Sequence, residues 1–186
     1  VDDLPNDGSD TLALIIWAHA QINREDSPIE NVVLDLSANH GGINDAAVVT
    51  VAWFLGEASF GAKNTMTGAM GNSFYRADVN RDRVFDEKDT LQGKRLFCMT
   101  SSFSFSNGNL VPCMLKESGV VTMLGRTSGG GSCSAQPLSS AWGICFQISG
   151  TNRSSFMKNG SFYDVDRGAD PDFVISEPEK YYDRQA

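Results

Sequence analysis

The stretch Cys98–Asn109, C-M-T-S-S-F-S-F-S-N-G-N, decides how the chain is organised. It follows the apolar pair Leu96-Phe97 and leads into the apolar run Leu110–Leu115, a pattern that predicts a strand, a turn of small residues and a helix. Such an elbow turns one hydroxyl toward solvent, and the amide behind it and the helix N-terminus lie ready to hold negative charge. Ser106 is the predicted nucleophile at this elbow.

An ordinary strand is the alternative for the same stretch. Ser101, Ser102, Ser104 and Ser106 would then form one polar face alternating with Phe103 and Phe105, with Ser106 or Asn107 as the N-cap of the next helix. On this stretch alone the ordinary strand is favoured, so the elbow needs support from the rest of the chain.

Length and charge limit the class of protein. A chain of 186 residues fits one domain spanning residues 1–186. Its net charge of −8 argues against nucleic acid as a partner, and no apolar run is long enough to cross a bilayer. The chain starts at Val1 without an initiator Met, so we expect it to be the C-terminal part of a longer protein with further domains upstream.

Upstream of the elbow, the pattern predicts a helix, a strand and a second helix. Asp10 can cap a helix that carries apolar residues to Ile22, with His19 expected to be a hydrogen-bonded core residue. The run 31–36 is typical of a strand buried on both faces of a parallel sheet. It breaks at Gly41-Gly42, where the backbone could approach a ligand closely or simply turn into the next helix.

Downstream of the elbow, we expect strands over 119–125 and 142–148, a polar turn over 151–160 and a closing extended segment over 168–175. Three consecutive glycines, Gly129–Gly131, indicate a loop that moves or lies against a ligand. Together these elements predict an α/β fold with a mostly parallel, buried sheet.

The segment 78–89 has the ligand spacing of a calcium loop. Arg83 stands where glycine usually makes the sharp turn, and Asp89 replaces the longer bidentate Glu, so a self-balanced acidic surface loop is equally open. A structural Ca²⁺ would be held by oxygen atoms of Asp78, Asn80, Asp82, the Val84 carbonyl, Asp86 and Asp89.

Four pieces in this order resemble the tail-specific, or C-terminal processing, serine peptidases of family S41. Asp35–Gly42 resembles that family's D-L-R-x-N-x-G-G, Phe103–Asn109 its S-A-S-A-S-E elbow and Gly168–Asp172 its G-I-x-P-D, while Gly119–Gly125 resembles the strand after the nucleophile helix. The resemblance implies a ClpP/crotonase-like superhelix of ββα units, in which the loop 78–89 is an insertion.

The resemblance also chooses among the serines. An ungapped register through Gly119 and Gly125 places the family's nucleophile on Ser106, and a two-residue insertion would move it to Ser104. The oxyanion would be held by the amide of Asn107 and by that of Gly41 or Gly42.

The general base is where the sequence departs from the family. In the same register the family's catalytic lysine falls on Gly131, so a Ser–Lys dyad cannot be assumed. Three outcomes stay open. His40 takes the proton, because imidazole exchanges protons readily near neutral pH; a histidine upstream of Val1 does so; or the chain binds peptides without cutting them. His40 as a plain exposed turn residue is the alternative to a catalytic role.

The sequence therefore predicts a serine-type peptidase that cleaves polypeptides through a Ser106 acyl-enzyme and needs no catalytic cofactor. The alternative is an inactive peptide-binding or scaffold domain of the same fold. Acyl-CoA chemistry, as in crotonase relatives, is disfavoured because it does not need the serine elbow. A calcium-type loop suits an extracytoplasmic or cell-envelope location, where that ion is plentiful.

Overall fold

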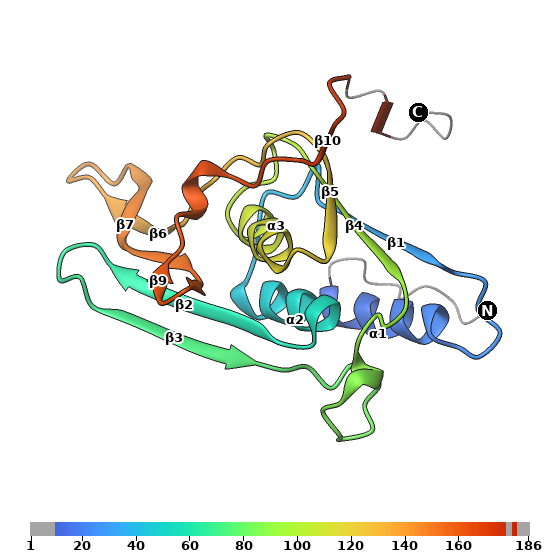
Figure 1. Ribbon diagram of the computed structural model, residues 1–186. Helices are drawn as coiled ribbons and strands as arrows, with labels where there is room; N and C mark the ends of the chain where they lie inside the picture. The colour runs from blue at the N-terminus through green and yellow to red at the C-terminus, as the bar shows by residue number, and fades with distance from the viewer. Residues whose placement is uncertain (1–9, 178–179, 182–186) are drawn as a thin grey trace.

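The computed structural model describes residues 10–177 and 180–181 (Figure 1). Three helices and two sheets of four strands make up most of this part of the chain. The helices are α1 Thr11–Ile22, α2 Asn44–Leu55 and α3 Asn107–Ser118. The strands are β1 Asn31–Asp35, β2 Ala58–Asn64, β3 Met70–Tyr75, β4 Arg95–Thr100, β5 Val121–Gly125, β6 Cys133–Ser139, β7 Cys145–Ser155, β8 Met157–Lys158, β9 Ser161–Phe162 and β10 Phe173–Val174, with short 3-10 turns η1 Glu87–Asp89 and η2 Val165–Arg167.

The first sheet is parallel, with strand order β1-β4-β5-β10. Cys98 at its centre pairs with Leu34 on one side and Met123 on the other. Helix α3 packs on β4 and β5, and α2 packs on α3. The predicted α/β fold with a mostly parallel sheet is confirmed, since helices pack on this parallel four-stranded sheet.

One expectation for this sheet is wrong. The apolar run 31–36 was expected to be buried on both faces, but β1 is an edge strand and Val33 is exposed. Its apolar residues do still cover the core on the other face, where Val32 and Leu34 pack against the buried cluster.

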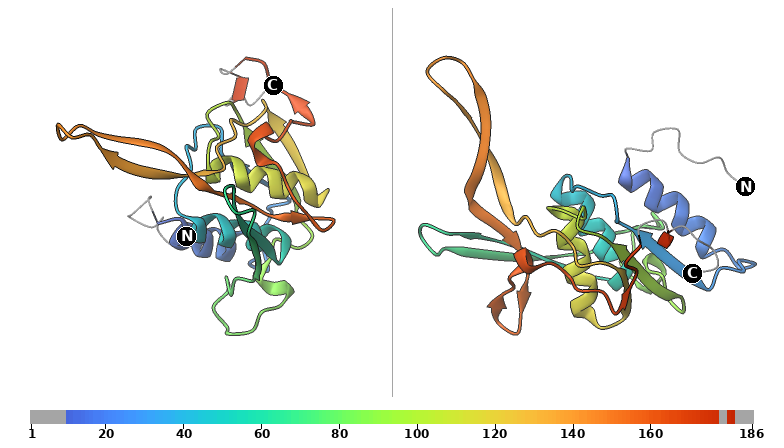
Figure 2. Two further views of the ribbon diagram at one scale, coloured as in Figure 1. Left: turned by 90° about the vertical axis from the view of Figure 1, so that its left-hand side faces the viewer. Right: turned by 90° about the horizontal axis from the view of Figure 1, so that it is seen from above.

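The second sheet is antiparallel, with order β3-β2-β7-β6. It consists of two long hairpins that project from the body of the molecule (Figure 2). The hairpins meet where Gly61–Asn64 pair with Asn152–Ser155 and where Thr65 donates to the Thr151 carbonyl. The prediction of a polar turn over 151–160 is wrong in its first half, because β7 continues through Ser155.

Helix α1 begins and packs as the pattern predicts. The Asp10 side chain accepts a hydrogen bond from the Ala13 N–H at 3.0 Å, which satisfies one of the free amides at the helix start. His19 is buried, and its Nδ1 accepts a hydrogen bond from Trp53 Nε1 at 3.1 Å. Burial lowers the pKa of His19, against smaller opposing effects of the Lys88 backbone and Asp89. His19 is thus the core histidine that the sequence predicts.

Core residues come from all three helices and from both central strands of the parallel sheet. Cys98 and Cys113 lie in this core, and burial raises the pKa of the Cys113 thiol to about 12. All four cysteines are free. No helix in the described part of the chain is long and apolar enough to span a membrane.

Candidate active site

Ser106 lies in a strained backbone conformation at the start of α3. Strand β4 ends at Thr100, and Ser106 has φ 56° and ψ −124°, a region that costs a non-glycine residue about 1–3 kcal/mol and is found at functional sites. Its N–H donates to the Gly130 carbonyl at 2.9 Å, and its own carbonyl accepts from the amides of Asn109 and Leu110. The strand therefore ends well before Ser106, which excludes the ordinary strand and leaves the elbow.

The loop after β1 lies directly against this elbow. Gly41 has φ +103°, and a Cβ placed there would lie 2.7 Å from Ser106 Cβ and 2.9 Å from the Phe105 carbonyl oxygen. The Phe105 N–H donates to the Asn39 carbonyl at 3.0 Å, which ties the two segments together. Two pieces of chain more than sixty residues apart in sequence thus form one site, and only glycine fits at their contact.

Two backbone N–H groups remain free beside Ser106. Among the described residues, the amides of Asn107 and Gly42 donate to no acceptor, whereas the Gly41 amide donates to Asn39 Oδ1 at 2.8 Å. The Asn107 side chain donates to the Gly42 carbonyl at 2.8 Å and to Asn44 Oδ1 at 3.0 Å, which fixes the Gly42 peptide. Of the two glycines, Gly42 is therefore the one with an N–H available to an oxyanion.

Ser104, the second choice as nucleophile, is a structural residue. It is fully buried, its Oγ donates to the Leu36 carbonyl at 2.7 Å, and it accepts from the Ser101 amide at 2.9 Å. A hydroxyl with both functions used and no access to solvent cannot attack a substrate. The prediction for Ser104 is wrong for that reason, and Ser106, which is half-buried rather than fully buried, stays the candidate nucleophile.

The glycine loop packs tightly against the elbow. A Cβ at Gly129 would lie 2.4 Å from the Ser102 carbonyl oxygen, and one at Gly131 would lie 2.4 Å from the Phe105 ring. The Gly129 amide donates to the Ser104 carbonyl at 2.8 Å. Gly129 thus allows close approach of two backbones and Gly131 allows close approach of a ring, a packing role that was not part of the expectation of a loop that moves or lies against a ligand. The Phe105 ring also covers Gly131, the position where the family has its lysine.

His40 is exposed beside the site but does not contact the nucleophile. Its ring meets the ring of Phe103 edge-on, with 6.0 Å between the centroids. No described side chain forms a hydrogen bond with the Ser106 hydroxyl. The site thus combines a strained serine with two free amides, and no base from residues 10–177 or 180–181 contacts the hydroxyl.

Sequence reasoning missed the parts played by Asn39, Asn44 and Phe105. Asn39 holds Gly41 through its side chain and Phe105 through its carbonyl. The only sequence signal for it is its place in the D-L-R-x-N-x-G-G pattern. Nothing in the sequence indicates that Asn44 would fix Asn107, because that contact depends on how α2 packs against α3.

An apolar cavity of about 670 Å³ opens beside the free amides. Gly42 and Asn107 form part of its wall, and residues of α1, β1, α2 and α3 contribute to the rest. The apolar part of the lining is Leu12, Leu34, Leu36, Ile43, Ala46, Ala47, Val49 and Val111. The cavity has room for an apolar side chain of a ligand held at the elbow.

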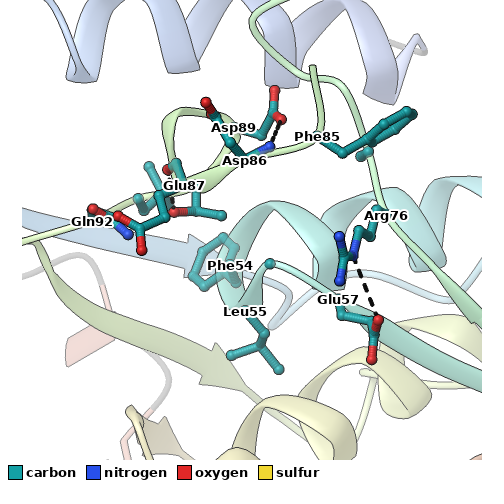
Figure 3. A pocket seen from close by; sticks show the side chains of 13 residues that line it. Phe54, Leu55, Glu57, Arg76, Phe85, Asp86, Glu87, Asp89 and Gln92 are labelled. Carbon is teal, nitrogen blue, oxygen red and sulfur yellow. Dashed lines mark hydrogen bonds and ion pairs between the residues drawn. The ribbon is translucent and has the colours of Figure 1, made fainter. Parts of the chain in front are cut away.

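The predicted calcium loop lies at the far end of α2. The first residue of that helix, Asn44, contacts the elbow, whereas Phe54 and Leu55 at its end line a separate cavity of about 570 Å³ with Asp86 and Asp89 (Figure 3). A helix of 12 residues is about 18 Å long. An ion bound in this loop would therefore act on stability and not on Ser106.

Part of this loop fits a calcium ion and part does not. Arg83 has φ +68° at the position where glycine is usual, its N–H donates to Asp78 Oδ2 at 3.0 Å, and Asp78 Oδ1 is buried with no hydrogen-bond partner. Asp89, however, accepts the amides of Val79 at 2.8 Å, Asn80 at 3.2 Å and Asp86 at 3.1 Å.

Of the six predicted ligands, Asp78, Asn80, Asp82, Val84, Asp86 and Asp89, the first thus has a buried oxygen without a partner, whereas the last is occupied by three amides. Among the residues that the structure describes, no group of three or more His, Cys, Asp or Glu side chains is arranged to hold a metal ion. Calcium binding stays a prediction for this loop, with Asp78 as its first ligand.

Comparison with known proteins agrees with this geometry. The family model "Peptidase family S41" matches residues 16–175. A search of curated proteins finds no match.

Several solved structures share the fold. The photosystem II D1 C-terminal processing protease has a TM-score of 0.64 at 15% identity, with 90% of this chain and 39% of that one covered. A lipoprotein from Streptococcus agalactiae has a TM-score of 0.63 at 18% identity, with 94% and 60% covered. A putative peptidase from Parabacteroides merdae has a TM-score of 0.60 at 16% identity, with 82% and 47% covered. The chain thus spans 39% to 60% of the length of these three structures, and it belongs to peptidase family S41.

Proposed function

We propose that this chain is the catalytic domain of a serine peptidase that cleaves polypeptides. The observation that carries the proposal is the strained conformation of Ser106 next to two free amides. A fold keeps such strain where a function depends on it, and a serine held in this way on a strand-to-helix turn is how hydrolases expose a nucleophile.

The proposed reaction proceeds through an acyl-enzyme. Ser106 Oγ attacks the carbonyl carbon of the scissile peptide and loses its proton to a base, while the carbonyl oxygen becomes an oxyanion that accepts from the amides of Asn107 and Gly42. Collapse breaks the C–N bond, the amine leaves with the proton, and water then hydrolyses the ester. Each oxyanion donor contributes about 3 kcal/mol to lowering the barrier.

His40 is our candidate for the base. It precedes Gly41 in the loop that touches Ser106, and the contact recorded for its ring is the edge-on one with Phe103. A change of rotamer that breaks a single aromatic contact costs little. A histidine from outside this chain would serve equally if His40 does not.

The second candidate is a peptide-binding domain of the same fold without catalysis. The observation that favours it is the Phe105 ring over Gly131, which fills the place of the family's lysine. In both cases the ligand is a polypeptide, and the apolar cavity beside Gly42 and Asn107 would take an apolar side chain. The likeness to a lipoprotein supports a location at the cell envelope for either activity.

Hydrolysis of an unfolded, dye-labelled casein separates the two candidates. We expect slow cleavage that Ser106→Ala abolishes and that Ser102→Ala, at an exposed serine outside the site, leaves unchanged. His40→Gln should lower kcat with little change in KM if His40 is the base. Absence of cleavage together with saturable binding of the casein would support the binding domain and refute the peptidase.

A further inference from the structure

The β6–β7 hairpin projects away from the body that contains α1–α3, and we propose that it is a dimerisation arm that packs against the same hairpin of a second copy of this chain (Figure 2). Strand β7 pairs with β2 over Asn152–Ser155, and over Cys145–Ser149 it pairs only with β6. A two-stranded hairpin with both faces in water is marginally stable by itself. The arm is therefore stabilised when another protein surface covers one of its faces.

One face of this arm is apolar. Leu138 lies opposite Phe146 in the ladder, and Gln136 lies opposite Ile148. Because side chains alternate between the faces of a strand, Ile144, Phe146 and Ile148 share the face of Leu138. All four are exposed, and Trp142 in the connecting turn is 89% exposed. The other face carries small and polar side chains from the intervening positions.

The distribution of charged residues favours a second copy of this chain as the partner that covers the arm. All 15 Lys and Arg and all 23 Asp and Glu lie outside residues 127–152, and so do both histidines. The net charge of −8 makes two copies repel over most of their surface. The electrostatic repulsion between them is therefore weakest where the contact surface carries no charge. A charged protein partner would have no complementary group to meet on the arm, and an anionic membrane would be repelled by the chain as a whole.

The area of the patch agrees with a modest dimer. The five apolar side chains expose on the order of 500 Å² in total, the size at which patches on soluble proteins mark interaction sites. Two such faces would bury on the order of 1,000 Å² together, which is the lower limit for a specific interface. Pro137 lies in β6 and has no N–H to donate, so pairing through the free strand edge is disfavoured and packing through the apolar face is left.

Sedimentation equilibrium of this chain over about a hundredfold range of concentration tests the proposal. We expect the mass to rise from the monomer value of 20.1 kDa to twice that value. Trp142→Ser leaves the strand ladder intact and should raise the dissociation constant at least tenfold. Phe146→Glu should abolish the dimer, because it buries a charge opposite its own copy. Val120→Glu places the same charge at an exposed apolar position outside the arm and should leave the dimer unchanged.

A monomer at every concentration would overturn the proposal, and so would a dimer that survives Trp142→Ser and Phe146→Glu. Should Phe146→Glu fail to fold, as judged by near-UV circular dichroism, Trp142→Ser still decides. If the chain is monomeric and floats with phosphatidylcholine vesicles, and Trp142→Ser no longer floats, the arm binds a lipid surface. That result would overturn the proposal that it binds a second copy of the chain. The contact does not involve Ser106, so its presence or absence is independent of the peptidase activity.

Discussion

The substitution Gly41→Ala tests whether the loop after β1 touches the serine elbow. The new methyl group would lie 2.7 Å from Ser106 Cβ, 2.9 Å from the Phe105 carbonyl oxygen and 3.1 Å from the Asn107 amide nitrogen. Carbon atoms prefer separations of about 3.5–4.0 Å, so the loop must move by roughly 1 Å. Two of these three atoms belong to the backbone, which cannot rotate out of the way.

The expected cost has two parts. Gly41 has φ +103°, and placing a non-glycine residue in such a conformation costs about 1–3 kcal/mol. Overpacking a tight contact costs about 1–3 kcal/mol more. We therefore expect the free energy of unfolding to fall by about 2–6 kcal/mol, which for a chain of this size lowers Tm by roughly 5–20 °C.

Two control substitutions, at Gly42 next to Gly41 and at Gly68 between β2 and β3, separate these parts in urea and thermal unfolding. Gly42→Ala meets no atom within 4 Å and should change stability by less than about 0.5 kcal/mol. Gly68→Ala has φ +73° in open space and should show the backbone cost alone, about 1–2 kcal/mol. If Gly41→Ala loses as little stability as Gly42→Ala, Gly41 has neither the left-handed conformation nor the contact with the elbow. If it loses as much as Gly68→Ala, only the backbone cost is present and the close contact is absent.

Three further predictions concern other parts of the chain. Because burial lowers the pKa of His19, the unfolded state binds more protons below about pH 6.5, and stability should fall as pH drops there, by at most about 1.4 kcal/mol per pH unit. His19→Gln should remove this component from urea unfolding curves, and a pH dependence that disappears instead in His40→Gln would contradict the assignment. Calcium should give calorimetric heat and raise Tm, an effect lost in Asp78→Asn and kept in Asp26→Asn; a chain without heat or Tm shift does not bind the ion. Asn109→Ala should lower the free energy of unfolding by about 2–4 kcal/mol, because this buried amide donates to the Val165 carbonyl and accepts from Ser128; a loss under about 0.5 kcal/mol would show that these bonds matter little.

The elements near the site could be predicted from the sequence because their signals are local. Asp10 caps α1 as its residue type indicates, and Gly119 ends α3 in a left-handed conformation. The elbow follows from the order of apolar strand, small residues and apolar helix. The choice between Ser104 and Ser106 could not be settled in the same way, because two registers were possible and only burial distinguishes them.

Features that depend on distant neighbours were not accessible from the sequence. The run 31–36 has the composition of a central strand, yet strand order places it at the edge, and no local pattern reports strand order. The hairpins β2–β3 and β6–β7 are exposed on both faces over much of their length. The β2–β3 hairpin lacks the alternation of apolar and polar residues that marks a half-buried strand, whereas Phe146, Gln147 and Ile148 in β7 do alternate and lie in the strand expected over 142–148. The glycines Gly129–Gly131 were expected to form a loop that moves or lies against a ligand. Their packing was not foreseen, because Ser102 and Phe105, which Gly129 and Gly131 approach, lie far earlier in the chain.

Reaction with a biotinylated fluorophosphonate, followed by mass spectrometry of the intact chain and of its tryptic peptides, measures most directly whether the fold exposes a reactive serine. The proposed active site predicts a single adduct on Ser106 that is missing in Ser106→Ala and retained in Ser102→Ala. Labelling of the folded chain at another serine, or no labelling under conditions in which the same preparation cleaves casein, would contradict Ser106 as the nucleophile.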